Sequence, residues 1–402
     1  MRIYQINVTA RFSTGNLVGA IHSELIRQGH EARFAYGFGG EKKENYFQVA
    51  DIWTLRLNAR WARMTGNERV FAKNAAKKLI SDIIEFDPDA IHIHNLHGNY
   101  VDYFVFLEWL SELNKPVIIT LHDCWFYTGG CYHYTVNHCG KWRTECKSCN
   151  HQLGYMFHKL HPIENDEFCR KRDALSRIDK LYITTVSEWL KEEAKKSFLG
   201  NREIIAIPNG IDCSLYYPRD VGELQEKYNC SDKVVLLGVA SSWSDRKGLN
   251  TWKLISEHLD ESYQIILVGL NTEQLKALPK KIIGLPRVNN EKELRELYSL
   301  ADIYVNLSPE ETFGLPTVEA MACGTPVVVL NSTANPELVD DSVGRIAASP
   351  SVEDVLKALN EVRLIGKRNM TASCIERANT LYSIKIMTER YLNLYRKVLG
   401  RV

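Results

Sequence analysis

The chain has 402 residues, of which 45% are hydrophobic and 25% are charged, and its net charge at pH 7 is +1. This length exceeds what one ordinary hydrophobic core supports, so two domains are expected, and the near-neutral charge argues against a nucleic acid partner. No apolar run approaches the ~20 residues needed to cross a bilayer, and Met1–Val8 is typical of a strand rather than a signal peptide. We therefore expect a cytoplasmic protein whose ten cysteines are mostly reduced.

Strand-like and helix-like patterns alternate along the first half of the chain. This alternation predicts a parallel sheet covered by helices, that is, a doubly wound α/β domain. The predicted strands are residues 3–8, 90–94, 117–121, 181–186 and 204–207, and the predicted helices are 17–28 and 70–85. Between them, residues 124–165 are irregular and rich in Cys, His, Tyr and Trp.

A second set of strands begins after residue 230. The predicted strands are residues 234–239, 265–269, 303–307 and 327–330. We expect two doubly wound, Rossmann-like α/β domains over residues 1–200 and 201–384, followed by a C-terminal amphipathic helix over 385–402.

Residues 309–327 form the most informative stretch, with the sequence PEETFGLPTVEAMACGTPV. Glu311 and Glu319 stand on either side of a turn that opens a short helix. Pro316 suits the first helical turn and Gly324 the position just past the helix end. The stretch therefore predicts a loop and helix between two strands.

This loop and helix have the chemistry of a binding site. Backbone N–H groups at Phe313, Gly314 and Leu315 would form an anion seat, and Gly314 allows close backbone approach. Carboxylates beside an anion seat are favourable if they accept hydrogen bonds from sugar hydroxyls. A nucleotide diphosphate sugar carries a diphosphate with a sugar on each side. The alternative is an ordinary amphipathic helix with solvated glutamates.

The segment ETFGLPTVEAMACGTPVV resembles the E-x7-E motif of the retaining glycosyltransferases of family 4, which have the GT-B fold. The fragments DAIH, TVS and IPNGID are also similar to that family. The resemblance implies two domains facing a cleft, with the C-terminal helix 385–402 packed on the first. It also implies that Glu311 lies against the donor sugar, that Glu319 holds the ribose hydroxyls, and that the backbone from Thr312 to Leu315 meets the diphosphate.

The same resemblance implies a reaction. A hexose would move with retention from a nucleotide diphosphate sugar to a glycan or lipid-linked acceptor, with no cofactor needed for catalysis. A WFxTGGC segment, here starting at Trp125, is similar to loops in bacterial polysaccharide glycosyltransferases, which implies surface polysaccharide biosynthesis. The rivals are a catalytically silent protein that binds nucleotide sugars and a GT-B phosphorylase, although no lysine stands in a convincing context for pyridoxal phosphate.

The segment SWSDRKG over residues 242–248 follows the first strand of the second domain. A cation there would neutralise the diphosphate and the charge that grows on it. Family members carry an Arg five residues before the Lys of the Lys-Gly pair, but here that position is Ser242, while Lys247 is kept. We hypothesise that Arg246 supplies the missing charge; the alternative is a solvated Arg246 beside a functional Lys247.

Three places in the first domain add candidate residues. Gly15 lies in a glycine turn that is expected to open the first helix, which suits a phosphate or sugar but is too short for a dinucleotide fingerprint. His122 and Asp123 end a strand where α/β sheets bind ligands; the resemblance implies that His122 reaches the donor sugar, and the alternative is a histidine hydrogen-bonded within its loop. His94 and Asn95 are expected near the acceptor, or else His94 forms a buried structural pair with His92.

Four cysteines fall in the irregular segment, at positions 131, 139, 146 and 149. Cys146 and Cys149 form a C-x2-C knuckle, and Cys131 and Cys139 could complete a tetrahedral zinc site that staples the loop. Four reduced thiols are the alternative.

Residues 56–78 are basic, with aromatic residues interleaved. The basic residues are Arg56, Arg60, Arg63, Arg69, Lys73, Lys77 and Lys78, and the aromatic ones are Trp53, Trp61 and Phe71. Such a segment can lie on an anionic membrane, which would suit a lipid-linked acceptor. The alternative is a solvated basic face whose aromatic side packs inward.

Overall fold

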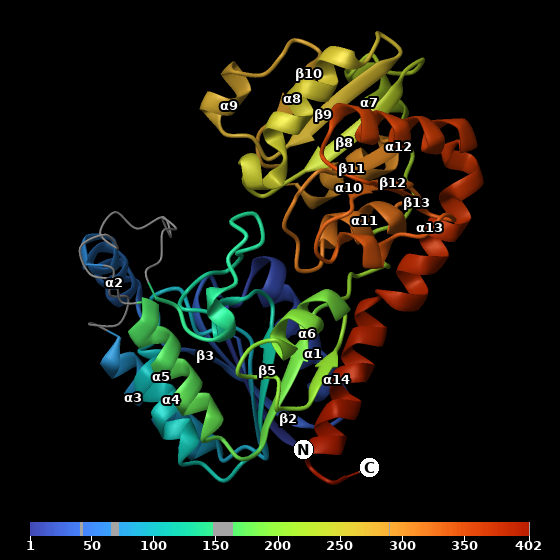
Figure 1. Cartoon of the computed structure of the whole chain (residues 1–402). Helices are drawn as coiled ribbons and strands as arrows, with labels where there is room; N and C mark the ends of the chain where they lie inside the picture. Colours follow the sequence, from blue (N-terminus) through green and yellow to red (C-terminus); the bar gives the residue numbers. More distant parts are fainter. Residues whose placement is uncertain (41–42, 66–71, 148–163, 289, 402) are drawn as a thin grey trace. The chain divides into compact units, whose positions relative to one another are not determined.

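The computed structural model describes the whole chain except residues 41–42, 66–71, 148–163, 289 and 402. It divides into two compact units (Figure 1). Unit 1 comprises Met1–Pro208 and Thr388–Val402, and unit 2 comprises Asn209–Met387.

Unit 1 is built on a parallel sheet with the strand order β3-β2-β1-β4-β5-β6-β7. The strands are β1 (Arg2–Thr9), β2 (Glu31–Phe38), β3 (Tyr46–Gln48), β4 (Ala90–Ile93), β5 (Val117–Leu121), β6 (Leu181–Thr185) and β7 (Ile204–Ala206). All five residues of β5 are buried, as expected for a central strand with helices on both faces.

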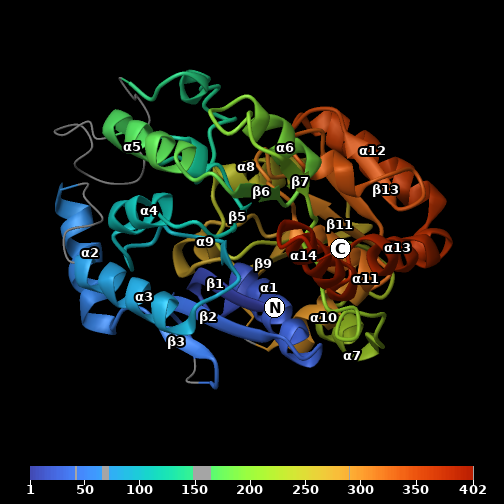
Figure 2. The ribbon, with the colours of Figure 1, turned by 90° about the horizontal axis from the view of Figure 1, so that it is seen from below.

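The helices of unit 1 are α1 (Phe12–Arg27), α2 (Ile52–Thr65), α3 (Lys73–Phe86), α4 (Tyr103–Ser111), α5 (Glu164–Ser176) and α6 (Glu188–Lys195). Helix α4 packs against both α3 and α5 (Figure 2). Ser187 caps α6, as predicted, by accepting a hydrogen bond from the Leu190 N–H at 3.2 Å.

The last helix, α14 (Ile384–Val398), belongs to unit 1 from Thr388 onward. The Tyr395 hydroxyl lies 2.7 Å from His92 Nδ1, and the Tyr391 hydroxyl lies 3.2 Å from Thr120 Oγ1. Both tyrosines are buried. Hydrogen bonds as well as apolar contacts therefore hold the end of the chain on the sheet of unit 1.

Unit 2 has a parallel sheet with the order β10-β9-β8-β11-β12-β13. Its strands are β8 (Val234–Val239), β9 (Tyr263–Val268), β10 (Ile282–Leu285), β11 (Ile303–Asn306), β12 (Val327–Leu330) and β13 (Gly344–Ala347). Its helices are α7 (Gly222–Lys227), α8 (Leu249–His258), α9 (Thr272–Lys276), α10 (Glu291–Leu300), α11 (Leu315–Ala322), α12 (Val352–Ile365) and α13 (Lys367–Leu381).

The predicted α/β class is confirmed, since both sheets are parallel and helices connect their strands. The pattern did not predict β2, β3, β10 or β13. Each of these four strands contains a polar residue or a glycine that interrupts its apolar run, such as Arg33 and Gly37 in β2. Within the described part of the chain, no helix is both long enough and apolar enough to cross a bilayer.

Candidate active site

The carboxyl edge of the unit 2 sheet contains a topological switch point between β8 and β11. From β8 the chain builds outward to β9 and β10, then returns to the other side of β8 with β11. Doubly wound sheets bind ligands where the strand order reverses in this way. The loops after β8 and β11 meet here, because the Ser308 hydroxyl contacts the carbonyl of Arg246 at 2.9 Å and that of Glu310 at 3.0 Å.

Lys247 and Glu311, both predicted site residues, form an ion pair at this edge. Lys247 Nζ lies 2.5 Å from Glu311 Oε1, and the two side chains are 25% and 16% exposed. Gly248 makes the approach possible, since its φ is +77° and a Cβ there would lie 2.3 Å from the Leu307 carbonyl oxygen. The pair places a cation and a carboxylate together in a half-buried position.

Hydrogen bonds from the loop after β12 fix the loop that carries Glu311. The Glu311 N–H donates to Thr333 Oγ1 at 2.9 Å, the Ala334 N–H donates to the Glu311 carbonyl at 3.2 Å, and Asn335 Nδ2 donates to the Ser308 carbonyl at 3.0 Å. No sequence pattern indicates Thr333, Ala334 or Asn335, because their role depends on the pairing of β11 with β12.

Helix α11 begins as the motif predicts. Gly314 is its N-cap with φ +100°, Pro316 lies in the first turn, and Gly324 follows the helix end with φ +78°. The Phe313 side chain is only 4% exposed and packs edge-on against Tyr382. Phe313 can therefore serve a ligand only through its backbone, which is the role predicted for residues 312–315.

Glu319 is oriented by a residue that the sequence analysis missed. The Tyr298 hydroxyl, on α10, donates to Glu319 Oε2 at 2.7 Å, and Tyr298 is fully buried. Burial, with the nearby Glu319 carboxylate, raises the pKa of Tyr298 well above its usual value, so it stays a hydrogen-bond donor. No local pattern reveals this contact, because it joins two different helices.

Ser242 and Arg246 are both exposed. The Arg246 carbonyl is held by Ser308, so its backbone position is fixed beside the ion pair. Whether its guanidinium replaces the arginine expected at position 242 stays a prediction.

In unit 1, two candidate histidines meet at the carboxyl edge of β4 and β5. His94 Nδ1 and His122 Nε2 share a hydrogen bond of 3.0 Å. Burial lowers the pKa of His122 to about 4, although Asp123 opposes this shift, and burial with the nearby His92 and His122 lowers the pKa of His94 well below its usual value. Both rings are therefore neutral at pH 7.

His92, His94 and Asn95 lie in the interior, with exposed fractions of 0%, 1% and 5%. His92 Nε2 lies 2.7 Å from Thr120 Oγ1. This geometry favours the buried structural alternative for His92 and His94. The acceptor role predicted for His94 would then be indirect, exerted through His122.

Asp123 is more accessible and interacts with two neighbours. Its Oδ1 accepts from the Trp125 N–H at 2.9 Å and its Oδ2 lies 3.1 Å from His97 Nε2, with the Asp123 and His97 side chains 18% and 17% exposed. Burial favours a higher pKa for Asp123, but the charge and hydrogen bond of His97 outweigh it and lower that pKa. Asp123 is therefore an ionised carboxylate that a hydroxyl could reach.

The expected position of Gly15 is wrong. It does not lie in a turn before the first helix but inside the first turn of α1, which begins at Phe12. A Cβ at Gly15 would lie 2.8 Å from the carbonyl oxygen of Thr9, so glycine is needed for close packing of helix on strand. Its role toward a phosphate or sugar stays a prediction.

The proposed zinc site is only partly within the described residues. Cys131, Cys139 and Cys146 lie among the described residues, which include no group of three or more His, Cys, Asp or Glu able to hold a metal. Cys149 lies outside the described residues. The four-cysteine site stays a prediction, which the metal content of protein purified without chelator would test.

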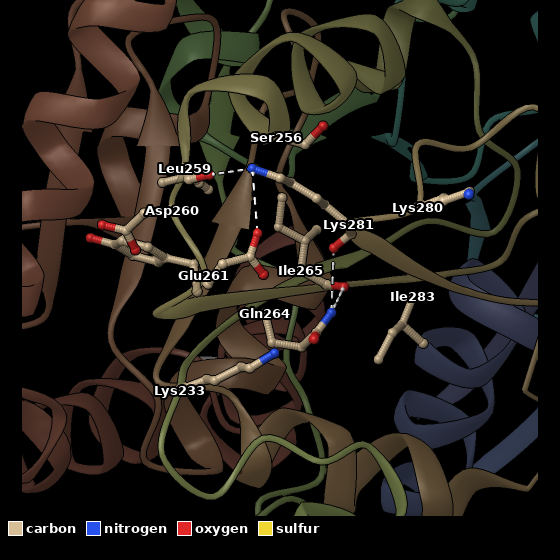
Figure 3. A pocket seen from close by; sticks show the side chains of 11 residues that line it. Lys233, Ser256, Leu259, Asp260, Glu261, Gln264, Ile265, Lys280, Lys281 and Ile283 are labelled. Atoms are coloured by element: carbon tan, nitrogen blue, oxygen red, sulfur yellow. Dashed lines mark hydrogen bonds and ion pairs between the residues drawn. The ribbon is translucent and has the colours of Figure 1, made fainter.

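A pocket of about 330 Å³ lies at the opposite edge of the unit 2 sheet (Figure 3). It is lined by residues at the amino ends of β8, β9 and β10, among them Lys233, Gln264 and Lys281. Lys281 Nζ contacts the Leu259 carbonyl at 2.9 Å and Glu261 at 3.9 Å. Because ligands of doubly wound sheets bind at the carboxyl edge, this pocket is not the candidate active site.

Two doubly wound parallel-sheet units, with a Glu-x7-Glu helix at the switch point of the second, define the class of GT-B glycosyltransferases. The family model "Glycosyltransferase Family 4" matches residues 14–215, and "Glycosyl transferases group 1" matches residues 223–380. The chain therefore belongs to glycosyltransferase family 4.

Relatives that are named for a function are distant in sequence. The chain is 24% identical over 422 positions to WcaC of Escherichia coli K12, named for colanic acid biosynthesis, with 99% of this chain and 100% of WcaC covered. It is 27% identical over 214 residues to the O-antigen chain mannosyltransferase B of Escherichia coli, covering 50% of this chain and 56% of that protein.

Solved structures share the fold. Sucrose-phosphate synthase from Thermosynechococcus elongatus is similar over 100% of both chains, with a TM-score of 0.74 and 15% identity. HepE from Anabaena, crystallised with UDP-glucose, is similar over 99% of this chain and 100% of its own, with a TM-score of 0.66 and 16% identity.

Proposed function

We propose that this glycosyltransferase moves a hexose, with retention, from a nucleotide diphosphate sugar to a glycan or lipid-linked acceptor in surface polysaccharide biosynthesis. The observation that carries the proposal is the Lys247–Glu311 ion pair in the loop before α11, with Glu319 on α11 itself and hydrogen-bonded to Tyr298. The names of WcaC and the O-antigen mannosyltransferase support the pathway, and the UDP-glucose complex of HepE supports the donor class.

The donor would bind at the switch point of unit 2. The diphosphate would contact the amino end of α11, where the helix dipole favours negative charge, and the Lys247 ammonium. Glu319 would accept hydrogen bonds from the ribose hydroxyls, with its carboxylate oriented by the hydrogen bond that Oε2 accepts from Tyr298. Glu311 would hold the hexose.

Stabilisation of the charge on the leaving diphosphate would provide most of the rate enhancement. As the bond between the sugar carbon and the phosphate oxygen breaks, its electron pair moves to the diphosphate. Lys247 and the helix dipole are already aimed at that charge, so little reorganisation is needed. The acceptor hydroxyl bonds to the same face of the sugar carbon, and its proton passes to the leaving diphosphate, so no protein base or metal is required.

Unit 1 would contact the acceptor. Asp123 is an ionised, partly exposed carboxylate able to accept a hydrogen bond from a sugar hydroxyl. His122 is neutral and hydrogen-bonded to His94, so it would serve as a hydrogen-bonding group rather than as an acid.

The experiment separates transfer from silent binding. Protein is incubated with UDP- or GDP-hexoses, with and without a lipid-linked oligosaccharide, and the anomeric proton signals are followed by nuclear magnetic resonance. Acceptor-dependent release of nucleotide diphosphate with retained configuration is expected. Tight donor binding without turnover on any acceptor would favour a binding protein, and an inverted product would contradict retention.

Donor binding is tested separately. Glu319→Ala should lower the melting-temperature increase that the donor produces, since ligands stabilise the state that they bind. Glu353→Ala, an exposed glutamate in the first turn of α12, is the matched control. An unchanged shift in Glu319→Ala would contradict the assigned ribose contact.

A further inference from the structure

Helix α2 of unit 1 presents several large apolar side chains outward. Its inner side includes Asn58, which is 1% exposed and donates from Nδ2 to the Asn99 carbonyl at 2.9 Å. Trp53 and Leu57, by contrast, are 68% and 52% exposed. A helix that packs on a globular core normally has the reverse arrangement, with apolar residues inward and amides outward. The alternative of inward-packed aromatic residues therefore fails for Trp53.

The exposed apolar residues form a patch rather than scattered positions. Trp53, Leu57 and Trp61 are spaced four residues apart, so they lie along one face of the helix. Trp61 is 36% exposed and Ile52 is 52% exposed. Single exposed apolar residues are common, but a continuous apolar patch indicates a surface that binds a partner.

The same face of α2 is basic. Arg56 and Arg60 are exposed, and the segment Ile52–Thr65 contains three arginines and no Asp or Glu. The Arg56 guanidinium carbon lies 5.7 Å from the centre of the Trp53 ring, so charge and aromatic surface are adjacent. Lys73 and Lys77, in the first turns of α3, are also exposed. Arg69 and Phe71 lie outside the described residues.

We propose that the outer face of α2 binds an anionic membrane surface. Trp53 and Leu57 would enter the boundary between headgroups and acyl chains, where indole rings are favoured. Arg56 and Arg60 would pair with lipid phosphates, each contributing through the negative surface potential. The proposal concerns binding alone and does not depend on the transfer reaction.

A second copy of this chain fits the face less well than lipid does. A two-fold interface would bring each patch against its own copy. Arg56 and Arg60 would then meet the same arginines with no acidic residue from α2 to neutralise them. Anionic headgroups provide the missing negative charge. A membrane surface can also bind arginine through its phosphates and tryptophan through its headgroup boundary on the same face of a helix.

Flotation with lipid vesicles tests the proposal. The whole protein is mixed with vesicles of phosphatidylcholine alone or of phosphatidylcholine with phosphatidylglycerol. It should float with the mixed vesicles, and the bound fraction should fall as salt rises, because exposed charges are screened. Trp53→Ser/Leu57→Ser should lower partitioning about tenfold or more. Arg56→Glu/Arg60→Glu should remove the preference for phosphatidylglycerol.

The matched control makes the same two kinds of substitution, apolar to serine and basic to glutamate, on a helix of unit 2. Leu364 is 78% exposed and Lys357 is exposed, both on α12 of unit 2. Leu364→Ser/Lys357→Glu should float like the unaltered protein. Circular dichroism melting shows that each variant is folded.

Three outcomes would overturn the proposal. The first is that the unaltered protein does not float with either kind of vesicle. The second is that both α2 variants float as well as the unaltered protein does. Alternatively, Trp53→Ser/Leu57→Ser converts a dimer into a monomer in sedimentation while vesicle binding is absent, which would make the face a contact between copies.

Discussion

The Lys247–Glu311 pair of unit 2 and the His94–His122 pair of unit 1 reach a neutral resting state in different ways. In unit 2, Lys247 and Glu311 are charged and neutralise each other at 2.5 Å. In unit 1, His94 and His122 are uncharged because burial lowers the pKa of each. The ion pair keeps a cation available for a growing negative charge, whereas the histidine pair can only exchange neutral hydrogen bonds. We therefore expect charge stabilisation from unit 2 and hydroxyl recognition from unit 1.

The largest effect should follow from removing the cation of the ion pair. Lys247→Ala should lower kcat about 10²–10³-fold, as loss of a preorganised charge-stabilising group does. Lys276→Ala is the control, since Lys276 pairs with Glu273 on the exposed surface of α9. Steady-state kinetics with a transferable donor measure both, and a kcat that stays within a few fold would exclude Lys247 from the chemistry.

The close approach of the β8 and β11 loops should be sensitive to one methyl group. Gly248→Ala combines a left-handed φ with a Cβ placed against the Leu307 carbonyl, and should lower the free energy of unfolding by about 2–4 kcal/mol. Gly29→Ala has the same φ of +77° but meets nothing within 4 Å, so it should cost only about 1 kcal/mol. Equal losses in urea unfolding would mean that the contact with β11 is not tight.

Tyr298→Phe should weaken donor binding without changing the chemistry. Loss of a hydrogen bond to a carboxylate costs about 1.5–3 kcal/mol, so the donor KM should rise about tenfold while kcat changes little. The defect should disappear with a donor that lacks ribose hydroxyls. Tyr263→Phe, whose hydroxyl accepts from Arg363 at the opposite sheet edge, is the control. An equal defect with the deoxyribose donor would indicate a structural role only.

The histidine pair should affect stability only in acid. The folded pKa of His122, about 4, lies below its unfolded value near 6.5, so the unfolded chain takes up a proton first. Its contribution is intact above pH 6.5 and is lost as pH falls toward 4, by up to about 1.4 kcal/mol per pH unit.

His122→Gln should lower the slope of the unfolding free energy against pH, between pH 4 and 6.5, by the equivalent of about one proton. His258→Gln alters an exposed histidine of α8 and should leave the slope unchanged. Urea unfolding at several pH values measures both, and an unaltered slope in His122→Gln would show that this histidine is not buried as a neutral ring.

The elements of the core could be predicted, since buried parallel strands are continuous apolar runs. The sequence predicted residues 117–121, 234–239 and 327–330 as strands with the bounds that the structure has. In each of the short strands β3, β10 and β13 a polar residue or a glycine interrupts the apolar run that the four residues of β12 keep, and these strands form because the neighbouring strand offers a partner. The first helix was predicted to begin at residue 17, but α1 begins at Phe12, ahead of the small and polar residues Ser13, Thr14 and Gly15.

By itself, the sequence determined the class of fold, the Glu-x7-Glu helix with its glycine and proline boundaries, and the candidate residues Lys247, Glu311 and Glu319. These features depend on local chemistry: backbone conformation, helix termini and the run length of apolar residues. Only the tertiary structure decided that Lys247 pairs with Glu311, that Tyr298 holds Glu319, that His94 and His122 share a hydrogen bond, and that α2 presents Trp53 outward. Each of these results joins residues from separate elements or depends on which face of an element is covered, and no local pattern encodes either.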